Sequence, residues 1–149
     1  MDNQPTQHSH RRGSEFFGLS LKPLFDYARA DFKLNRREPD GHTLRHHLET
    51  AAQQGNGAAI LELDDQPDLP YCLTYLWGWF GELAARRQSN GMDVSPIAWR
   101  EIEAWATLTG RDPKPWEIKA LVKLDDLLLN DHHEHQAAKQ KSKIQIARR

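Results

Sequence analysis

Positions 69–84 read LPYCLTYLWGWFGELA, and this stretch decides the fold class. Its apolar residues recur every three to four positions, which is typical of one buried face of an amphipathic helix. We expect this helix to open at Asp68 or Pro70 and to end near residues 86–87, where two arginines suit the negative end of the helix dipole. The strongest apolar pattern in the chain is therefore helical.

Similar patterns lie on both sides of this stretch. Upstream, Pro23 suits the first turn of a helix that runs to about residue 36, and a second helix covers roughly residues 44–52. Residues 58–63 are the one strand-like run, but an isolated strand leaves its backbone unpaired, so we interpret them as a connection or a helical turn. Downstream, Ser95 and Pro96 read as the N-cap and first residue of a helix that Gly110 closes.

The last predicted helix begins at Pro115 and ends near Asn130. The sequence thus predicts an all-α protein with one small domain of about five helices. We place the helical domain at residues 14–131, with its densest core signal at 69–129. Residues 1–13 lack large apolar side chains after the first position and are expected to be a disordered arm. Residues 132–149 are expected to form a basic tail rich in His, Lys and Arg, helical at most in part.

Composition excludes several classes of protein. Twenty Lys and Arg residues against twenty-one Asp and Glu residues give a net charge of −1, so no global basic field draws the molecule to nucleic acid or anionic lipid. The single cysteine, Cys72, cannot close an internal disulfide, and its apolar neighbours indicate a buried, inert thiol. No apolar run approaches a membrane span, and the first residues do not resemble a signal peptide. We expect a soluble, unprocessed protein.

Catalytic and metal-binding patterns are absent. The chain has no phosphate-binding glycine loop, no nucleophile elbow and no paired-cysteine metal spacing. His42 and His46 have helical i,i+4 spacing without the intervening glutamate of a zinc protease, and residues 131–135 only approximate an inverted zinc motif. The acidic pairs at 64–65 and 125–126 are interpreted as solvated faces and caps. No catalytic residue, metal or cofactor is predicted.

Aromatic residues are more numerous than a small core requires. All five tryptophans fall between positions 77 and 116. If Leu73, Trp77 and Phe80 face inward, Tyr71, Tyr75 and Trp79 lie off the centre of the buried stripe. We interpret these three rings, together with Trp99, as candidate partner-binding residues, because Tyr and Trp give large contact areas at low entropic cost. The alternative, a core that covers this helix on all sides, stays open. The predicted core residues are Leu73, Trp77, Phe80, Ile102, Trp105, Trp116, Leu121 and Leu124.

The order of these motifs resembles that of a known family. The blocks LWGWFGEL at 76–83, SPIAWREIEAW at 95–105 and LTG at 108–110, followed by PWE at 115–117 and Leu124-Asp125, are similar to small tail assembly chaperones of tailed bacteriophages. The piece LRHHLE at 44–49, with Gln54-Gly55, resembles the preceding helix, so the likeness spans roughly residues 43–130. Two glycines, Gly78 and Gly81, depart from a strong helix pattern.

The resemblance implies a helical protein without enzymatic activity that works in the cytoplasm of the infected bacterial cell. Proteins of this family bind the tape measure protein, keep it soluble, help to recruit tail tube protein and are absent from the mature virion. A homo-oligomer is left open, and neither a membrane nor a specific nucleic acid is expected as a partner.

Two alternatives remain at this point. A small structural virion protein of the tail or of the head-to-tail joint would share the helical build. A nucleic-acid-binding regulator would use the basic C-terminal residues, whose attraction to phosphate is sequence-independent and salt-sensitive.

Overall fold

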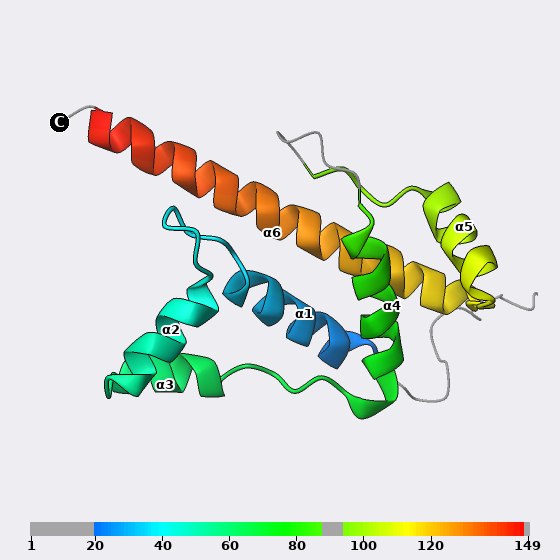
Figure 1. Ribbon diagram of the computed structural model, residues 1–149, viewed down its shortest axis with the longest axis horizontal. Helices are drawn as coiled ribbons and strands as arrows, with labels where there is room; N and C mark the ends of the chain where they lie inside the picture. Colours follow the sequence, from blue (N-terminus) through cyan, green and yellow to red (C-terminus); the bar gives the residue numbers. More distant parts are fainter. Residues whose placement is uncertain (1–19, 88–93, 148–149) are drawn as a thin grey trace, which may run out of the picture.

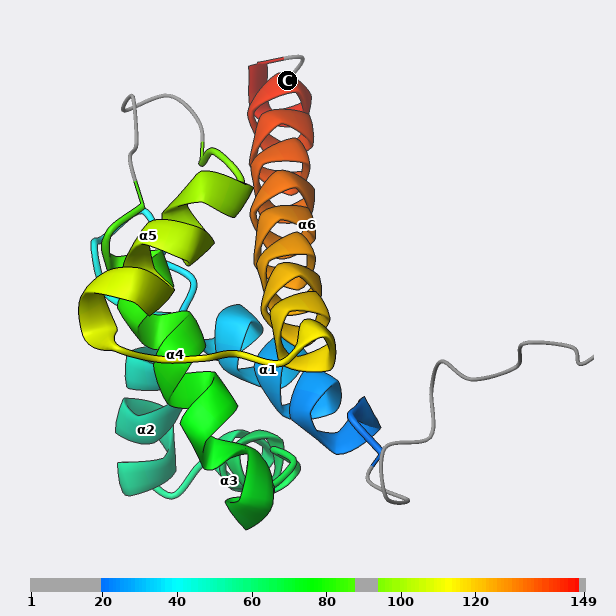
Figure 2. The same cartoon turned by 90° about the vertical axis from the view of Figure 1, so that its right-hand side faces the viewer.

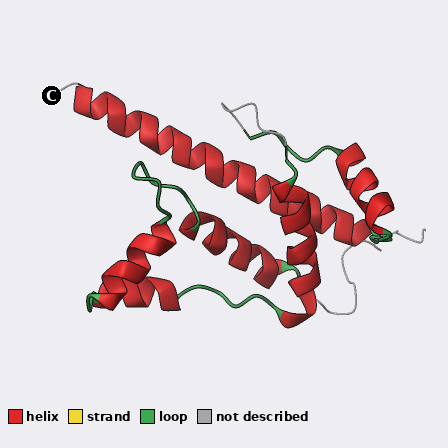
Figure 3. Cartoon of the chain, in the orientation of Figure 1, coloured by secondary structure: helices red, strands yellow, loops and turns green. Residues whose placement is uncertain are grey.

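The computed structural model describes residues 20–87 and 94–147 (Figure 1). Within these residues the fold is helical and no β-strand is present (Figure 3). The prediction of an all-α protein is confirmed, whereas the expected disorder of residues 1–13 lies outside the described part. The helices are α1 (Lys22–Leu34), α2 (Leu44–Gln53), α3 (Gly57–Asp64), the 3-10 helix η1 (Tyr71–Leu73), α4 (Thr74–Ala85), α5 (Trp99–Thr109) and α6 (Pro115–Ala147).

The N-terminal half of α6 is the centre of the core. Helices α1 and α4 both pack against it, and Figure 2 shows α4 and α5 on the same side of α6. Leu121 and Leu124 of α6 are almost completely buried, as are Leu24 of α1 and Leu76 of α4. Full burial of each such side chain contributes about 1.5–3 kcal/mol. The core residues are Leu24, Ala28, Phe32, Leu73, Leu76, Phe80, Leu83, Ile102, Ala120, Leu121, Leu124 and Leu127.

Aromatic rings join α1 to α4. The ring of Trp77 meets Tyr27 edge-on at 5.1 Å and lies 5.7 Å from Phe32, measured between ring centroids. Phe80 lies 5.8 Å from both Phe32 and Trp77. Aromatic pairs at these separations contribute about 0.5–1.5 kcal/mol beyond the area that they bury. The inward face of the 69–84 stretch is therefore covered by α1 as well as by α6.

Helices α2 and α3 form a hairpin that packs mainly against itself and touches α1. The side chain of Thr43 caps α2 by accepting from His46 N–H, and Asn56 caps α3 by accepting from Ala58 N–H. Between them Gly55 has a φ of 84°, a conformation that favours glycine. Residues 58–63, interpreted from the sequence as a connection or a helical turn, lie in α3. This hairpin adds little to the core, because no residue of α2 is buried.

Two predicted helix starts are wrong. The helix expected from Ser95 and Pro96 begins at Trp99, because Asp125 binds the N–H of Ile97 and holds the preceding residues outside the helix. The carboxylate of Glu101 then caps α5 by accepting from Ala98 N–H at 2.7 Å. The helix expected from residue 68 or 70 begins as η1 and becomes α4 only at Thr74.

The C-terminal residues are also more regular than expected. Helix α6 does not stop at Asn130 but continues to Ala147, so the segment predicted to be helical at most in part is a helix as far as it is described. Its sequence explains this result, because it contains good helix formers and neither glycine nor proline. The first turns beyond residue 130 are anchored to the end of α1, where Arg36 binds Asp131, and the ammonium of Lys139 donates to the carbonyl oxygen of Arg37 at 3.1 Å. None of the described helices has the length and apolarity needed to cross a bilayer.

Candidate partner-binding surface

A groove of about 760 Å³ lies between the C-terminal half of α4 and helix α5. Leu83, which is buried, and the half-buried Trp105 form its apolar part, and the exposed Leu108 stands at its edge. Charged side chains of both signs surround this apolar strip. The residues that line the groove are Glu82, Leu83, Ala85, Arg86, Arg87, Glu101, Ala104, Trp105, Leu108 and Thr109.

Glu82 connects the two walls of the groove. Its carboxylate accepts from the indole N–H of Trp105 at 2.9 Å and from two nitrogens of Arg111, each at 2.9 Å. The guanidinium carbon of Arg111 lies 5.0 Å from the ring centroid of Trp105 and 5.8 Å from that of Trp79. These contacts are charge-assisted hydrogen bonds and cation–π interactions, so they fix the orientation of Trp105 more firmly than apolar packing alone.

The start of α5 is held by a buried ion pair. Arg87, just after α4, binds Asp125 of α6, and their side chains are 7% and 6% exposed. Asp125 also accepts from Ile97 N–H at 2.8 Å, and Arg87 donates to the carbonyl oxygen of Ser95 at 2.8 Å. The interpretation of Asp125 as part of a solvated face is therefore wrong. The sequence alone did not show that an acidic residue on α6 would meet an arginine 38 positions earlier.

The four predicted partner-binding residues differ in their surroundings. Tyr71 and Trp99 are 92% and 67% exposed. Tyr75 and Trp79 instead belong to a ring cluster, in which Trp79 meets Tyr75 edge-on at 5.0 Å and Trp105 at 5.5 Å. None of the four lines the groove.

Tyr75 is tied to the first turn of α6. Its hydroxyl donates to Glu117 at 2.7 Å, and Glu117 also accepts from Lys114 N–H at 2.6 Å. Burial, followed by the hydrogen bond to the Glu117 carboxylate, raises the pKa of Tyr75 well above its usual value. Tyr75 thus makes a structural contact although the residue is 38% exposed.

The predicted core residues divide into two groups. Leu73, Phe80, Ile102, Leu121 and Leu124 are buried. The tryptophans Trp77, Trp105 and Trp116 are half-buried and pack against the core. Trp105 has two roles in the structure, because it packs on the core and lines the groove.

Sequence reasoning missed Leu108 and Ala104 as surface-forming residues. Leu108 is 86% exposed, and both residues lie on the groove side of α5. A signal was present, because Leu108 falls on the helix face away from the inward Ile102 and Thr109 positions of the predicted stripe. An apolar residue on a polar helix face indicates an interaction surface when it lies beside another apolar surface.

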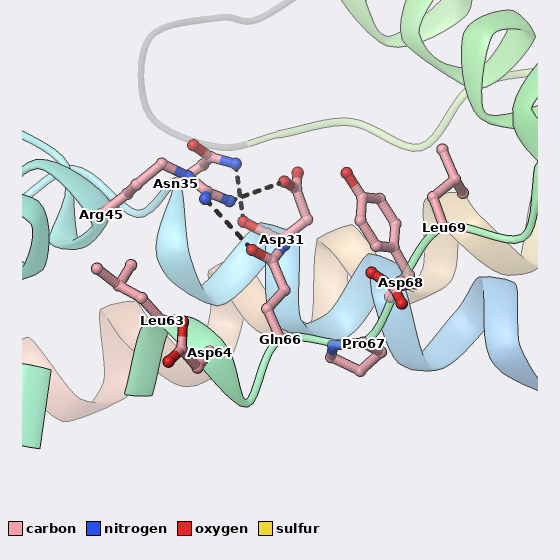
Figure 4. A pocket seen from close by; sticks show the side chains of 10 residues that line it. Asp31, Asn35, Arg45, Leu63, Asp64, Gln66, Pro67, Asp68 and Leu69 are labelled. Carbon is pink, nitrogen blue, oxygen red and sulfur yellow. Dashed lines mark hydrogen bonds and ion pairs between the residues drawn. The ribbon is translucent and has the colours of Figure 1, made fainter. Parts of the chain in front are cut away.

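A second cleft, of about 630 Å³, lies where α1, the start of α2 and the end of α3 meet (Figure 4). It is mainly polar, and Asp31, Asp64 and Asp68 are among its lining residues. Arg45 crosses it, donating to Asp31 at 3.2 Å and to Gln66 at 3.3 Å. Burial raises the pKa of Tyr27 at its edge.

The described residues show no cluster of three or more His, Cys, Asp or Glu side chains arranged to hold a metal ion. His42 and His46 stack at 4.5 Å between ring centroids, and His47 binds Asp40 at 2.9 Å. Cys72 is exposed, which corrects the expectation of a buried thiol, because η1 turns it away from the neighbouring buried Leu73.

The chain was compared with families of known proteins, with curated proteins and with solved structures. The sequence model of a family described as phage tail assembly chaperone matches residues 52–130. This range begins at the end of α2 and includes α3, η1, α4, α5 and the part of α6 that lies in the core. Neither a curated protein nor a solved structure matches the chain. Because the family match spans more than half of the 149 residues, this chain belongs to the phage tail assembly chaperones, a family without enzymatic activity.

Proposed function

We propose that this chaperone binds the tape measure protein of its phage and keeps it soluble while the tail is assembled, by covering an apolar stripe of a helical segment. The observation that carries the proposal is the α4–α5 groove, where exposed Leu108 and half-buried Trp105 lie next to buried Leu83. An amphipathic helix that enters such a groove presents apolar residues at i, i+3, i+4 and i+7.

The size of the groove suits this kind of ligand. Helix α5 has eleven residues, which corresponds to about 16 Å or three helical turns. A partner segment of similar length would place two or three apolar side chains against Trp105, Leu108 and Ala104. Charged residues of both signs at the rim, including Arg86 and Glu101, would orient the segment without selecting strongly for its net charge.

Holding and release need no covalent chemistry in this proposal. An affinity in the micromolar range, about −8 kcal/mol, would cover the tape measure protein and still let polymerising tail tube protein displace the chaperone by mass action. The chaperone would then act in the host cytoplasm and be absent from the mature virion. Tail tube protein is the second partner in this scheme.

Co-expression with the tape measure protein from the same phage genome tests the proposal. We expect the soluble fraction of the tape measure protein to rise when the wild-type chain is present and to fall with Leu108→Glu. Ile146→Glu is the matched control, because Ile146 is also an exposed aliphatic residue but lies at the far end of α6. If Leu108→Glu and Ile146→Glu solubilise the partner equally well, the groove is not the binding site. If the wild-type chain has no effect on solubility, the proposed function is wrong.

Virion composition separates this function from a structural role. Mass spectrometry of purified virions should detect the tape measure protein and not this chain. A stoichiometric signal from this chain would identify a structural component of the particle and contradict the proposal.

A further inference from the structure

Helix α3 exposes a face with two aliphatic side chains and one carboxylate, here called the α3 stripe, that nothing in the described chain covers. Gly57, Ile60, Leu61 and Asp64 have the i, i+3, i+4, i+7 spacing of one helix face, and all four are exposed, Leu61 to 71%. The opposite face carries the buried Ala59 and packs on the rest of the hairpin. A helix this apolar, with a single buried residue, is unusual for a surface without a partner.

The surroundings of this stripe are acidic. Residues 57–68 contain four acidic residues and no Lys or Arg. Of these, Glu62 pairs with Lys33, but Asp64, Asp65 and Asp68 have no ion-pair partner within the described ranges. Asp64 and Asp65 also stand at the C-terminal end of α3, where the helix dipole is already negative. This surface therefore favours a ligand that brings both aliphatic and cationic side chains.

The last turns of α6 have this composition. Residues 136–147 carry three lysines and no acidic residue, and every side chain from position 140 to 147 is exposed. Ala137, Lys141 and Ile144 lie on one face of the helix at i, i+4 and i+7. Lys139, on another face, is already bound to the carbonyl oxygen of Arg37. The free face thus presents a small residue, a cation and an exposed aliphatic side chain in register with the stripe on α3.

These two surfaces cannot meet within one chain. The C-terminal end of α6 lies at the top of the molecule and α3 at the bottom in both Figure 1 and Figure 2. Helix α6 contains no glycine or internal proline at which it could fold back, and kinks occur mainly at such positions. The complementary pair is available only between two molecules.

We propose that the α3 stripe binds the C-terminal turns of α6 from a second copy of this chain, and that the contact is reciprocal, giving a two-fold symmetric dimer. In this arrangement Lys141 of each copy lies against Asp64 of the other, and Ile144 packs on Leu61. The segment from Ala137 to Ala147 is about 16 Å long, enough to cover the roughly 12 Å of α3. A reciprocal contact uses both surfaces of both copies and closes the assembly. The dimer is independent of tape measure binding.

Sedimentation of the full chain over a range of concentrations tests the proposal. We expect the wild type to dimerise at 50 mM salt, and to dissociate more readily at 500 mM salt because screening weakens the ion pairs. Lys141→Glu and Asp64→Lys should each raise the dimer dissociation constant about tenfold or more, since two symmetry-related contacts change from attraction to repulsion. Circular dichroism should show unchanged helicity, because both positions are exposed.

A mixture of the two variants is the decisive sample. The glutamate at position 141 of one chain meets the lysine at position 64 of the other, and the unchanged Lys141 and Asp64 form the second contact. We therefore expect the equimolar mixture to recover a dimer that neither variant forms alone. Lys143→Glu is the matched control, because it makes the same charge change on the opposite face of the same helix, and it should weaken the dimer much less than Lys141→Glu.

Four results would overturn the proposal. The first is a wild type that stays monomeric at about 100 μM protein, a concentration at which weak dimers form, and the second is a mixture of the two variants that stays monomeric. The third is an equal rise of the dimer dissociation constant in Lys141→Glu and Lys143→Glu. The fourth is the growth of assemblies beyond the dimer. If the chain alone is monomeric but a tape measure segment protects α3 from hydrogen exchange, the α3 stripe belongs to that partner and not to a second copy.

Discussion

Removal of the Asp125 carboxylate should destabilise the fold strongly, although the residue lies next to an exposed aspartate on the same helix. Asp125 is 4% exposed, and its side chain binds both Arg87 and the N–H of Ile97. Asp125→Ala leaves a buried guanidinium without a counter-charge and a partly buried backbone donor without an acceptor. Breaking a buried ion pair from one side costs about 3–5 kcal/mol, and an unpaired backbone group adds about 1–3 kcal/mol.

The expected loss lies near the lower end of that sum. Arg87 keeps its hydrogen bond to the carbonyl oxygen of Ser95, and its long side chain can turn toward water. We therefore expect Asp125→Ala to lower the free energy of unfolding by about 4 kcal/mol. For a domain of ordinary stability, about 5–15 kcal/mol, this is a large fraction of the total.

Urea denaturation followed by tryptophan fluorescence and by circular dichroism measures this change. Asp126→Ala is the matched control, because Asp126 is exposed, and its effect should stay within about 0.5 kcal/mol. The double variant Arg87→Met/Asp125→Leu should recover the part of the loss that comes from the unpaired guanidinium, since apolar residues of similar size often replace a buried ion pair at little cost. The N–H of Ile97 stays unpaired in this variant. A loss below about 1 kcal/mol for Asp125→Ala would refute the reasoning, because the pair would then have to be solvated.

Three further predictions follow from other contacts. Leu124→Ala should lower the free energy of unfolding, measured by urea denaturation, by about 2–5 kcal/mol, because it opens a cavity in the centre of the core. Lys123→Ala, at the exposed neighbouring position, should leave this free energy almost unchanged. Gly110→Ala should lower the free energy of unfolding by about 1 kcal/mol, because Gly110 ends α5 with a φ of 66°, a conformation that alanine adopts only with strain. The space around Gly110 is open, so the added methyl group itself should meet no clash. An unchanged free energy of unfolding would contradict this reasoning. Ultraviolet titration should show that Tyr27 and Tyr75 both ionise above the usual range, and Tyr75→Phe should remove one of these two ionisations. Glu117→Gln should lower the pKa of Tyr75, because the carboxylate favours the protonated phenol, and an unchanged midpoint would show that burial alone raises it.

The aromatic residues of the 69–84 stretch show which features of the surface helical spacing can predict. Helical spacing correctly indicated that Tyr75 would not be fully covered, because the 100° rotation per residue is a property of the α-helix itself. The same spacing could not show that Trp79 would pack on Trp105 and under Arg111, since those partners lie on α5 and in the following turn. The groove also stayed hidden, because its walls come from two helices that the sequence pattern does not orient.

The amino-acid sequence by itself determined the helical class, most helix positions and the likeness to tail assembly chaperones, because periodicity, caps and motif order are local properties of the chain. Only the tertiary structure decided where α5 begins, that Asp125 is buried, and that the turns of α6 just beyond residue 130 are anchored to the end of α1. In each case the deciding contact joins residues far apart in the chain, as with Arg87 and Asp125 or Arg36 and Asp131. The energy of such contacts depends on burial, and burial is fixed only when the helices pack together.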